Sequence, residues 1–473
     1  MDLAKNSIPE AVKHIYLIAV CGTGMGALAC MLKDLGYQVS GSDQKIYPPM
    51  SHFLRQKGIA VSNGYEGAHL SYRPDLVVVG NAVSKDNPEV IAMQKLGLNF
   101  CSMPQAFNRL VAKDKKSILV TGTHGKTTTA AILAWILEVA GLAPGFMIGG
   151  ILKNFDSNYC LGNGPYFVIE ADEYDTAFFD KGPKFLHYDP YLAVLTSVEF
   201  DHADIYADLE QVKQAFGRFV SAISNQSLLI AHDDDNNIKS LLNRCKSRIE
   251  HYGRQSTSAW RLVQDTVAPP WTFFEVFKQG NRFGNFKTRL MGAHNLLNAL
   301  AAVAAADHLK VPVDFQTEAL ASFENVKRRQ ELRGQKNGIT VMDDFAHHPT
   351  AVKETLAAVR PFHPQGRILA VFEPRTNTSM RDVFQDVYSL CFDPADLICV
   401  RQPPLLDKIP PGHRFSSKKL VQDLKKRGKD AHYFPDTDAI IHFLIQEAKS
   451  GDLILIMSNG GFDNIHERLL ESL

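Results

Sequence analysis

Short apolar runs alternate with stretches of helical periodicity along most of the chain. Glycine or polar residues bound each run, which is typical of buried strands in parallel sheets. The runs lie at residues 15–20, 37–40, 75–80, 117–120, 166–169, 192–196, 339–342, 367–372, 397–400 and 453–457. Helical spacing follows two of them, at residues 27–35 and 130–140. This alternation predicts an α/β fold built on open parallel sheets.

Two segments depart from this alternation and help to divide the chain. Aromatic residues alternate along residues 260–290, which predicts antiparallel strands, and the alanine-rich residues 295–309 predict a packed helix. Residues 113–116 form a polar break, and residues 326–334 are dense in charge. A chain of 473 residues exceeds one ordinary core. We therefore predict three domains, at residues 1–112, 113–328 and 329–473.

Charge composition argues against nucleic acid and membrane partners. Lysine plus arginine and aspartate plus glutamate number 51 each, so no long-range field would hold the protein on a polyanion or an anionic membrane. Basic residues between 418 and 427 alternate with apolar ones at helical spacing, which predicts a solvated helix face. An anionic ligand must therefore be held by a local site. We expect a monomer or a weak homodimer.

Cysteine usage indicates a cytoplasmic protein. Seven cysteines lack the short paired spacings of a disulfide framework or a zinc site. Residues 15–32 are uncharged and resemble a signal peptide or a membrane span, but the glycine-rich residues 21–26 would break such a helix at its centre. A strand, a glycine turn and a helix account for this segment.

A glycine loop at residues 121–129 is the strongest functional signal. Its sequence, Thr-Gly-Thr-His-Gly-Lys-Thr-Thr-Thr, stands between a predicted strand and a predicted helix, as a triphosphate-binding loop requires. Lys126 would reach the β and γ phosphates, and the Thr127 hydroxyl would hold Mg²⁺. Val120 stands where the general pattern has glycine, so the loop is a variant. The residues expected to bind ATP here are Gly122, Thr123, His124, Gly125, Lys126, Thr127 and Thr128.

A second glycine loop, Gly22-x-Gly24-x-x-Ala27, fits the looser dinucleotide fingerprint. Asp43 follows about 20 residues later, where a ribose-binding acid stands. The alternative is a glycine turn that only packs a helix on a strand, and the usual ligand of the fingerprint is NAD. The other nucleotide loop favours an enzyme with two nucleotides over a dehydrogenase. The candidate substrate-binding residues are Gly22, Thr23, Gly24, Met25, Gly26, Asp43 and Asn81.

Acidic residues follow two predicted strands of the second block. Glu170 ends the strand at 166–169, where parallel sheets bind ligands, and is a natural Mg²⁺ ligand. Asp172, Glu173 and Asp175 fit a solvated acidic loop as well as a site. The stretch at residues 199–204 follows the strand at 192–196, and either His202 or the adjacent carboxylates could complete a metal site. We expect Thr127, Glu170 and His202 to hold Mg²⁺, which would neutralise charge on a transferring phosphoryl group.

Further polar groups stand near the inferred border between the second and third blocks. Asn295 and Asn298 lie three residues apart at a helix start, where they either cap the helix or contact a nucleotide. Arg329, with Arg328 and Arg333, lies at the inferred domain junction, where a guanidinium can clamp phosphate. Other candidates follow strands of the third block, namely Asp344, His347 and His348, and then Arg375, Asn377 and Thr378, which suit a carboxylate-bearing substrate.

Taken together, these motifs resemble the Mur ligase family over essentially the whole chain. The order of the glycine loop at 121–127, Glu170, His202, Asn295 with Asn298, Arg329 and Asp344 is similar to that of the family. The resemblance implies a Rossmann-like UDP-binding domain, a central P-loop ATPase domain and a Rossmann-like C-terminal domain. It also implies ATP and Mg²⁺ as cofactors. The residues expected to act in the reaction are Lys126, Glu170, His202, Arg329, Asp344, His347 and His348.

Within the family, the motifs are most similar to those of members that join a recycled tripeptide, L-Ala-γ-D-Glu-meso-diaminopimelate, to UDP-N-acetylmuramate. The stretches at residues 47–51, 170–181, 199–205, 331–334, 343–349, 373–375 and 458–462 carry this resemblance. It implies that ATP phosphorylates the lactyl carboxylate and that the peptide amine attacks the acyl phosphate. The nearest alternative adds L-alanine to the same nucleotide sugar. A nucleotide-dependent sensor without catalysis is an alternative of a different class.

Two positions bear on the transfer of family roles to this chain. Several Mur ligases carry a carbamylated lysine that bridges their metal ions, and Lys213 is the candidate near His202 for that modification. Other members place a lysine two residues after the acid that Asp344 matches, where this chain has Ala346. The resemblance leaves His347 or His348 for that role.

Overall fold

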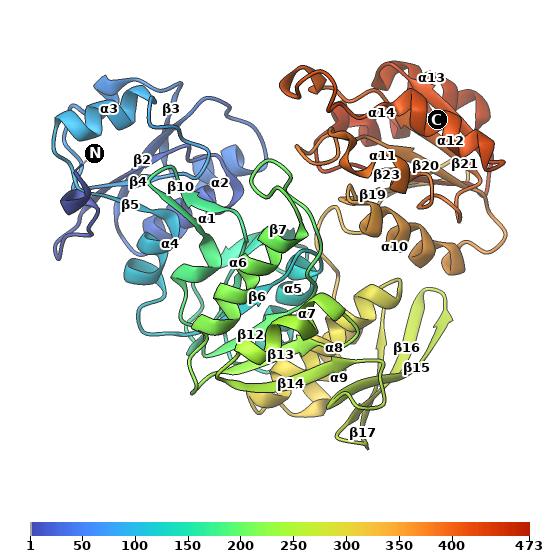
Figure 1. Ribbon diagram of the computed structural model, residues 1–473, viewed down its shortest axis with the longest axis horizontal. Helices are drawn as coiled ribbons and strands as arrows, with labels where there is room; N and C mark the ends of the chain where they lie inside the picture. The colour runs from blue at the N-terminus through green and yellow to red at the C-terminus, as the bar shows by residue number, and fades with distance from the viewer. Residues whose placement is uncertain (1) are drawn as a thin grey trace. The chain divides into compact units, whose positions relative to one another are not determined.

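Two compact units make up the protein. The computed structural model describes residues 2–473 (Figure 1). Unit 1 comprises Met1–Val198, Lys213–Trp260 and Ala301–Ala319, and unit 2 comprises Glu199–Val212, Arg261–Leu300 and Leu320–Leu473. Unit 1 thus contains all of the predicted first domain, and unit 2 all of the predicted third. The boundaries after residues 112 and 328 stay a prediction.

The N-terminal sheet of unit 1 is parallel and has the strand order β3-β2-β1-β4-β5. Because the order reverses between β1 and β4, a ligand-binding crevice is expected at the carboxyl ends of these strands. The first glycine loop follows β1. The elements are β1 (His14–Ile18), α1 (Thr23–Asp34), β2 (Gln38–Asp43), α2 (Met50–Gln56), β3 (Ala60–Asn63), β4 (Leu76–Val79), α3 (Pro88–Lys95), β5 (Phe100–Ser102) and α4 (Met103–Ala106).

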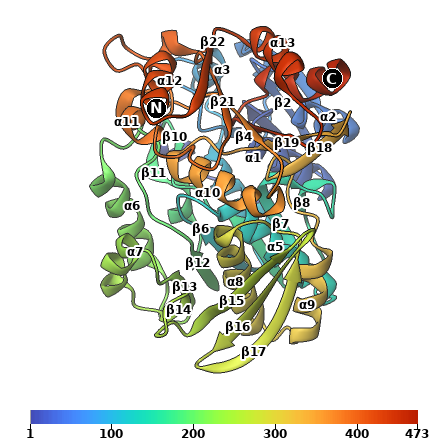
Figure 2. The same ribbon diagram turned by 90° about the vertical axis from the view of Figure 1, so that its right-hand side faces the viewer.

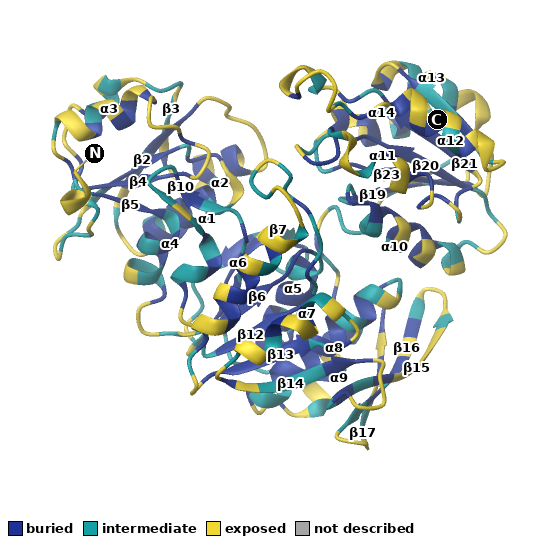
Figure 3. Ribbon diagram, in the orientation of Figure 1, coloured by how far each residue is buried: buried dark blue, intermediate teal, exposed yellow. Residues whose placement is uncertain are grey.

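A second sheet of unit 1 runs in the order β14-β13-β12-β6-β9-β7-β8. Its strands pair in parallel except at the β7–β8 edge. Helix α5 packs over β6, β7 and β9. The elements are β6 (Lys116–Thr121), α5 (Lys126–Val139), β7 (Gly145–Leu152), β8 (Ser157–Cys160), β9 (Tyr166–Glu170), β12 (Leu192–Leu195), β13 (Leu228–His232), α7 (Asn236–Leu241) and β14 (Arg248–Gly253). Figure 3 shows that β6 and β12 are largely buried.

A small antiparallel hairpin follows the acidic run after β9. It consists of β10 (Asp175–Ala177) and β11 (Asp180–Pro183). Phe178 and Phe179 at its tip pack against the core of the N-terminal sheet, and the Phe179 ring stands edge-on to that of Phe100 at 5.0 Å between centroids. The hairpin therefore ties the acidic run after β9 to the N-terminal sheet of the same unit.

The C-terminal sheet of unit 2 has the order β18-β19-β23-β20-β21-β22, with antiparallel pairing at β18–β19. Its two faces carry separate buried cores, centred on Phe372 and on Ile454. The elements are β18 (Glu331–Lys336), β19 (Ile339–Asp344), α10 (Pro349–Val359), β20 (Ile368–Phe372), α11 (Gln385–Tyr388), β21 (Leu397–Arg401), α12 (Ser417–Lys426), β22 (Asp430–Phe434), α13 (Thr437–Glu447), β23 (Leu453–Met457) and α14 (Ile465–Ser472).

An antiparallel ribbon forms the other part of unit 2. Strands β15 (Trp260–Ala268), β16 (Trp271–Lys278) and β17 (Asn281–Thr288) lie side by side (Figure 2), and β16 pairs with β17. This confirms the antiparallel strands predicted from the aromatic alternation. Three helices contain residues of both units, namely α6 (Leu209–Ala222), α8 (Ala293–His308) and α9 (Val313–Ser322).

Most predicted strands occur where the apolar runs place them, and β23 matches its prediction at both ends. The N-terminus differs. The predicted strand 15–20 ends at Ile18 because Ala19 takes a positive φ of 65°. The predicted helix 27–35 begins at Thr23, because the Gly26 N–H already donates to the Gly22 carbonyl. Across residues 2–473, no helix is both long and apolar enough to cross a membrane.

The aromatic core of unit 2 yields a stability prediction. Phe372 is fully buried, and its ring contacts those of Tyr388 and Phe392 at centroid distances of 5.2 and 5.7 Å. Phe372→Ala should lower the free energy of unfolding by about 3–5 kcal/mol, because it removes apolar contacts and leaves a cavity. Urea unfolding followed by circular dichroism measures the loss. Phe273→Ala, at an exposed ring, should cost only about 0.5 kcal/mol.

Candidate functional site

The glycine loop between β6 and α5 is fixed by residues that follow β12. The Thr196 hydroxyl donates to the His124 carbonyl at 2.5 Å, and the Ser197 hydroxyl accepts from the His124 N–H at 2.8 Å. Gly122 has a φ of 133°, and a Cβ there would lie 2.2 Å from the Thr196 hydroxyl oxygen. Glycine is therefore required at this position. Thr196 and Ser197 were missed in the sequence, where nothing distinguishes them from ordinary strand-end residues.

Lys126 is the cation at the centre of this loop. Its Nζ donates to Glu173 Oε2 at 2.8 Å and to the Gly122 carbonyl at 2.6 Å. Burial alone would lower the pKa of Lys126, but the carboxylates of Glu173, Asp172 and Glu170 outweigh it and raise that pKa above its ordinary value. The ammonium is therefore charged at neutral pH and suited to bind phosphate.

Thr127 and Glu170 stand together beside Lys126. The Thr127 hydroxyl donates to Glu170 Oε1 at 2.9 Å, and the Gly149 N–H donates to Glu170 Oε2 at 2.7 Å. Hydroxyl and carboxylate oxygens are the ligands that Mg²⁺ prefers. These two residues fit a magnesium ion that accompanies a bound triphosphate. Thr123 and Thr128, also predicted to contact ATP, are buried on either side of Lys126.

The first glycine loop of unit 1 is braced by the predicted ribose-binding acid. Asp43 Oδ2 accepts a hydrogen bond from the Cys21 N–H at 2.8 Å, and its Oδ1 accepts from the Lys45 N–H at 3.0 Å. Gly22 is the N-cap of α1, followed in the helix by Thr23, Gly24, Met25 and Gly26, and Asn81 is exposed after β4. The positive end of α1 therefore faces the expected crevice, as anion binding requires.

An acid and three histidines gather in unit 2. Asp201 is 4% exposed, its Oδ1 accepts from the His202 N–H at 2.7 Å, and its Oδ2 lies 3.9 Å from His347 Nε2. Burial alone would raise the pKa of Asp201, but His202, His347 and His348 together lower it far below its ordinary value. The predicted His202 and His347 therefore flank one carboxylate, which the sequence analysis did not single out.

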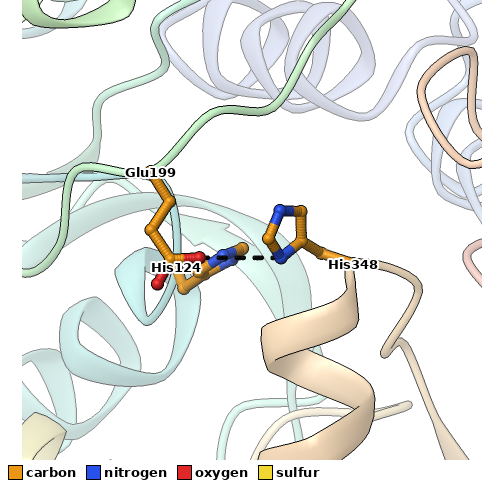
Figure 4. Close-up of side chains that lie close together, drawn as sticks. All are labelled: His124, Glu199 and His348. Carbon is orange, nitrogen blue, oxygen red and sulfur yellow. Dashed lines mark ion pairs between the residues drawn. The ribbon is translucent and has the colours of Figure 1, made fainter. Parts of the chain in front are cut away.

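His348 and Glu199 lie close together in the same unit (Figure 4). His348 Nδ1 lies 3.7 Å from Glu199 Oε2 and accepts from the Thr350 N–H at the start of α10. Its Nε2 therefore carries the hydrogen, which it donates to the Phe200 carbonyl at 3.0 Å. Both ring nitrogens of His348 thus have hydrogen-bond partners, so its position is largely structural.

The predicted amide pair and arginine also lie in unit 2. Asn295 Nδ2 donates to Gln330 Oε1 at 3.2 Å, and Asn298 Nδ2 donates to Asn295 Oδ1 at 3.2 Å. Since α8 begins at Ala293, Asn295 is not its N-cap, and that alternative is wrong. The Arg329 guanidinium lies 4.8 Å from the Phe345 ring centroid.

Asp344 ends β19 in a buried position. Its Oδ2 accepts from the Gln330 N–H at 2.8 Å, and its Oδ1 accepts from the Ala346 N–H at 2.8 Å and from the Thr355 hydroxyl at 3.2 Å. Burial raises the pKa of Asp344 above its ordinary value. Asp344 thereby fixes the backbone at Gln330, next to Arg329, and at Ala346, next to Phe345.

Arg375 lies after β20, and its side chain packs against Gly460. A Cβ on Gly460 would lie 2.2 Å from Arg375 Cδ, so the side chain fits because residue 460 has none. Arg375 NH1 lies 3.5 Å from Oε1 of Glu373, a fully buried acid that also pairs with Arg401. Nearby, Thr378 accepts from the Ala203 N–H and Asn377 donates to Asp204.

The predicted site residues therefore form several local groups. Unit 1 contains the glycine loop residues, Glu170, Asp43, Asn81 and Lys213, which lies half-buried on α6. Unit 2 contains His202, the amide pair, Arg329, Asp344, both histidines and the Arg375 group. Glu173, Asp201 and Glu373 are buried carboxylates that sequence reasoning did not select, because an acid in a polar run gives no sign of its burial.

Comparison with known proteins gives matches along almost the whole chain. Family models match as Mur ligase family, catalytic domain (residues 14–115), Mur ligase middle domain (residues 120–306) and Mur ligase, glutamate ligase domain (residues 328–460). The chain is 42% identical to UDP-N-acetylmuramate–L-alanyl-γ-D-glutamyl-meso-2,6-diaminoheptandioate ligase of Escherichia coli K12, covering 97% of this chain and 98% of that protein.

Two further similarities are informative. The chain is 35% identical to UDP-N-acetylmuramate–L-alanine ligase of Desulforapulum autotrophicum, over 97% of this chain and 98% of that protein. The crystal structure of a murein peptide ligase from Psychrobacter arcticus superposes with a TM-score of 0.72 at 36% identity, covering 97% of this chain and 98% of that one.

The lowered pKa of Asp201 predicts a pH-dependent contribution to stability. Asp201→Asn should reduce the free energy of unfolding at pH 7 by about 1–3 kcal/mol, the cost of impairing a buried charged hydrogen bond. Because the folded-state pKa is depressed, the contribution is complete above the unfolded-state pKa of about 4 and is lost as the pH falls through the folded-state pKa. Urea titrations at several pH values test this, with Asp265→Asn at an exposed site as control. A difference that stays constant in acid would contradict the prediction.

Proposed function

Because the chain belongs to the Mur ligase family, we propose that it joins L-Ala-γ-D-Glu-meso-diaminopimelate to UDP-N-acetylmuramate, with hydrolysis of ATP to ADP and phosphate. The observation that carries this proposal is the full-length match to the E. coli ligase named for these substrates, at 42% identity against 35% for the L-alanine ligase. The reaction belongs to peptidoglycan recycling. The alternative, transfer of L-alanine to the same acceptor, is less well supported by these identities.

The reaction proceeds in two steps in this proposal. One oxygen of the lactyl carboxylate attacks the γ-phosphorus of ATP, and ADP leaves. The peptide amine then attacks the acyl carbon, gives up a proton to a base, and expels phosphate as the carbon–oxygen bond breaks. Closure of the protein around the acyl phosphate must exclude water, since water would hydrolyse it.

In the phosphoryl-transfer step, Lys126 and the N–H groups of the glycine loop hold the phosphates. Bound Mg²⁺, held by Thr127 and Glu170, would supply neutralisation of charge on the transferring group. His202 and a carbamylated Lys213 remain proposed further contributors to this metal site. Asn295, Asn298 and Arg329 are proposed to contact the nucleotide, with Asp344 ordering the backbone beside Arg329.

His347 is the better candidate for the base that takes the amine proton. Its Nδ1 contacts the Phe345 carbonyl at 3.0 Å, which requires the hydrogen on Nδ1, so Nε2 is the atom proposed to take up the proton. Asp201, 3.9 Å from that Nε2, would stabilise the resulting imidazolium. His348 suits this task less well, since Thr350 and Phe200 engage both of its ring nitrogens.

The substrates are assigned to two further groups of residues. UDP-N-acetylmuramate is proposed to bind the first glycine loop, at Gly22–Gly26 with Asp43 and Asn81, and the peptide carboxylate is proposed to bind Arg375 with Asn377 and Thr378. We also place the enzyme in the cytoplasm, which agrees with the free cysteines found among the described residues.

A product assay decides between the two acceptor reactions. The purified protein is incubated with ATP, Mg²⁺ and UDP-N-acetylmuramate, and either L-alanine or the tripeptide is added. Phosphate release and mass spectrometry of the products are measured together. Turnover with the tripeptide supports the proposal. Turnover with L-alanine alone would show that the enzyme catalyses the biosynthetic reaction instead. Absence of turnover with either substrate would contradict a catalytic function.

Lys126→Ala should lower kcat by on the order of 10³-fold, because the cation that offsets phosphate charge is lost. Binding of UDP-N-acetylmuramate should stay within about twofold of wild type, since Lys126 and the first glycine loop follow different sheets of unit 1. Phosphate release and isothermal titration calorimetry measure the two quantities. Loss of both together would show that the assignment of two separate nucleotide sites is wrong.

Arg375→Ala should raise KM for the tripeptide by about 10–100-fold, as expected for a lost charged hydrogen bond. KM for ATP should change little, because this arginine is assigned to the peptide. Steady-state kinetics with each substrate varied in turn gives both constants. Arg468→Ala, at a partly exposed arginine of the same unit that pairs with Asp438, is the matched control. An unchanged peptide KM in Arg375→Ala would remove Arg375 from the peptide site.

A further inference from the structure

A buried carboxylate lies against the lysine of the phosphate-binding loop. Glu173 is 1% exposed, and its two carboxylate oxygens lie 2.8 and 3.1 Å from Lys126 Nζ. The same ammonium donates to the Gly122 carbonyl at 2.6 Å and lies 3.3 Å from the Thr123 carbonyl. Lys126 therefore turns back onto its own loop, and Glu173 contacts the ammonium that a phosphate needs.

The charge around Lys126 is unbalanced. Glu170 and Asp172 also act on this ammonium, so one cation faces three carboxylates. Lys184 lies 3.4 Å from Asp172 and offsets that acid in part. A free nucleotide would bring further negative charge into a site that is already negative, and repulsion is strong where water is largely excluded. A nucleotide that carries a divalent cation brings much less negative charge into the site.

Glu173 and Lys126 form a buried ion pair. Removing a buried carboxylate from its cation is costly, so the two side chains hold each other in place. The hairpin that follows Glu173 is anchored by Phe178 and Phe179 on the core of the N-terminal sheet. Glu173 thus belongs to a backbone segment that is fixed at its far end.

We propose that Glu173 is a positioning residue that holds Lys126 until a phosphate binds and makes the site select the magnesium complex of the nucleotide over the free nucleotide. A bound phosphate would replace Glu173 as the partner of the Lys126 ammonium. The cation bound to the nucleotide would then offset the negative charge of the nearby carboxylates. The inference rests on the proposed binding of ATP at this loop. It assigns to Glu173 a role in nucleotide selection that is separate from the metal-binding role proposed for Glu170.

Calorimetric titration with ADP, in Mg²⁺ and in EDTA, tests this role without relying on turnover. In wild type, Kd should be far lower in Mg²⁺ than in EDTA. Glu173→Gln keeps the shape but removes the charge, and should lower Kd for free ADP by about tenfold while changing Kd in Mg²⁺ by less than about threefold. The ratio of the two constants should therefore fall. Thermal unfolding should show that Glu173→Gln lowers the stability of the protein in the absence of nucleotide and that added ADP restores this stability.

Asp175→Asn is the matched control, because it removes one charge from the same segment at a residue that pairs with Lys181 rather than Lys126. Its ratio should equal that of wild type. Asp172→Asn should lower this ratio of dissociation constants less than Glu173→Gln does. It replaces Glu173→Gln as the test variant if Glu173→Gln does not fold. An unchanged ratio in Glu173→Gln, or in Asp172→Asn where that variant stands alone, overturns the inference. Failure of wild type to bind ADP in Mg²⁺ contradicts instead the proposed function.

Discussion

The ammonium of Lys126 and the carboxylates after β9 form the interaction on which the nucleotide loop depends. Thr127 reaches Glu170, the last residue of β9, at 2.9 Å, while Lys126 reaches Glu173, in the segment after that strand, at 2.8 Å. Because buried charges are stable only when paired, these contacts fix the loop, the helix start and the strand end together. When a ligand binds, contacts to phosphate and metal must replace these contacts between side chains.

Parallel strand pairing brings these groups to one edge of the sheet. In unit 1, β6 pairs with both β9 and β12, so the glycine loop after β6, Glu170 at the end of β9 and Thr196 after β12 meet at the carboxyl edge. Residues far apart in sequence therefore become neighbours through backbone hydrogen bonds alone. The apolar strands supply the stability, and the polar residues that follow them supply the chemistry.

Buried charge also orders the residues that follow the strands of unit 2. Asp343, at the end of β19, is 1% exposed and lies 3.3 Å from His466 Nε2 and 3.4 Å from Arg328 Nε. Burial alone would raise the pKa of Asp343, but His466, Arg328 and Arg333 lower it below its ordinary value. Arg328 also donates to the Gly460 carbonyl at 2.7 Å. This ion cluster thereby orders the loop on which Arg375 rests.

The sequence by itself determined the α/β class, the strand positions and both glycine loops, because apolar periodicity and glycine spacing are local properties of the chain. It also selected Lys126, Glu170 and Arg375 from their places after strands. Only the tertiary structure decided that Glu173, Asp201 and Glu373 are buried partners of cations or histidines, and that His348 has both ring nitrogens engaged. Burial and pairing depend on residues distant in sequence, which the spacing of a single chain does not record.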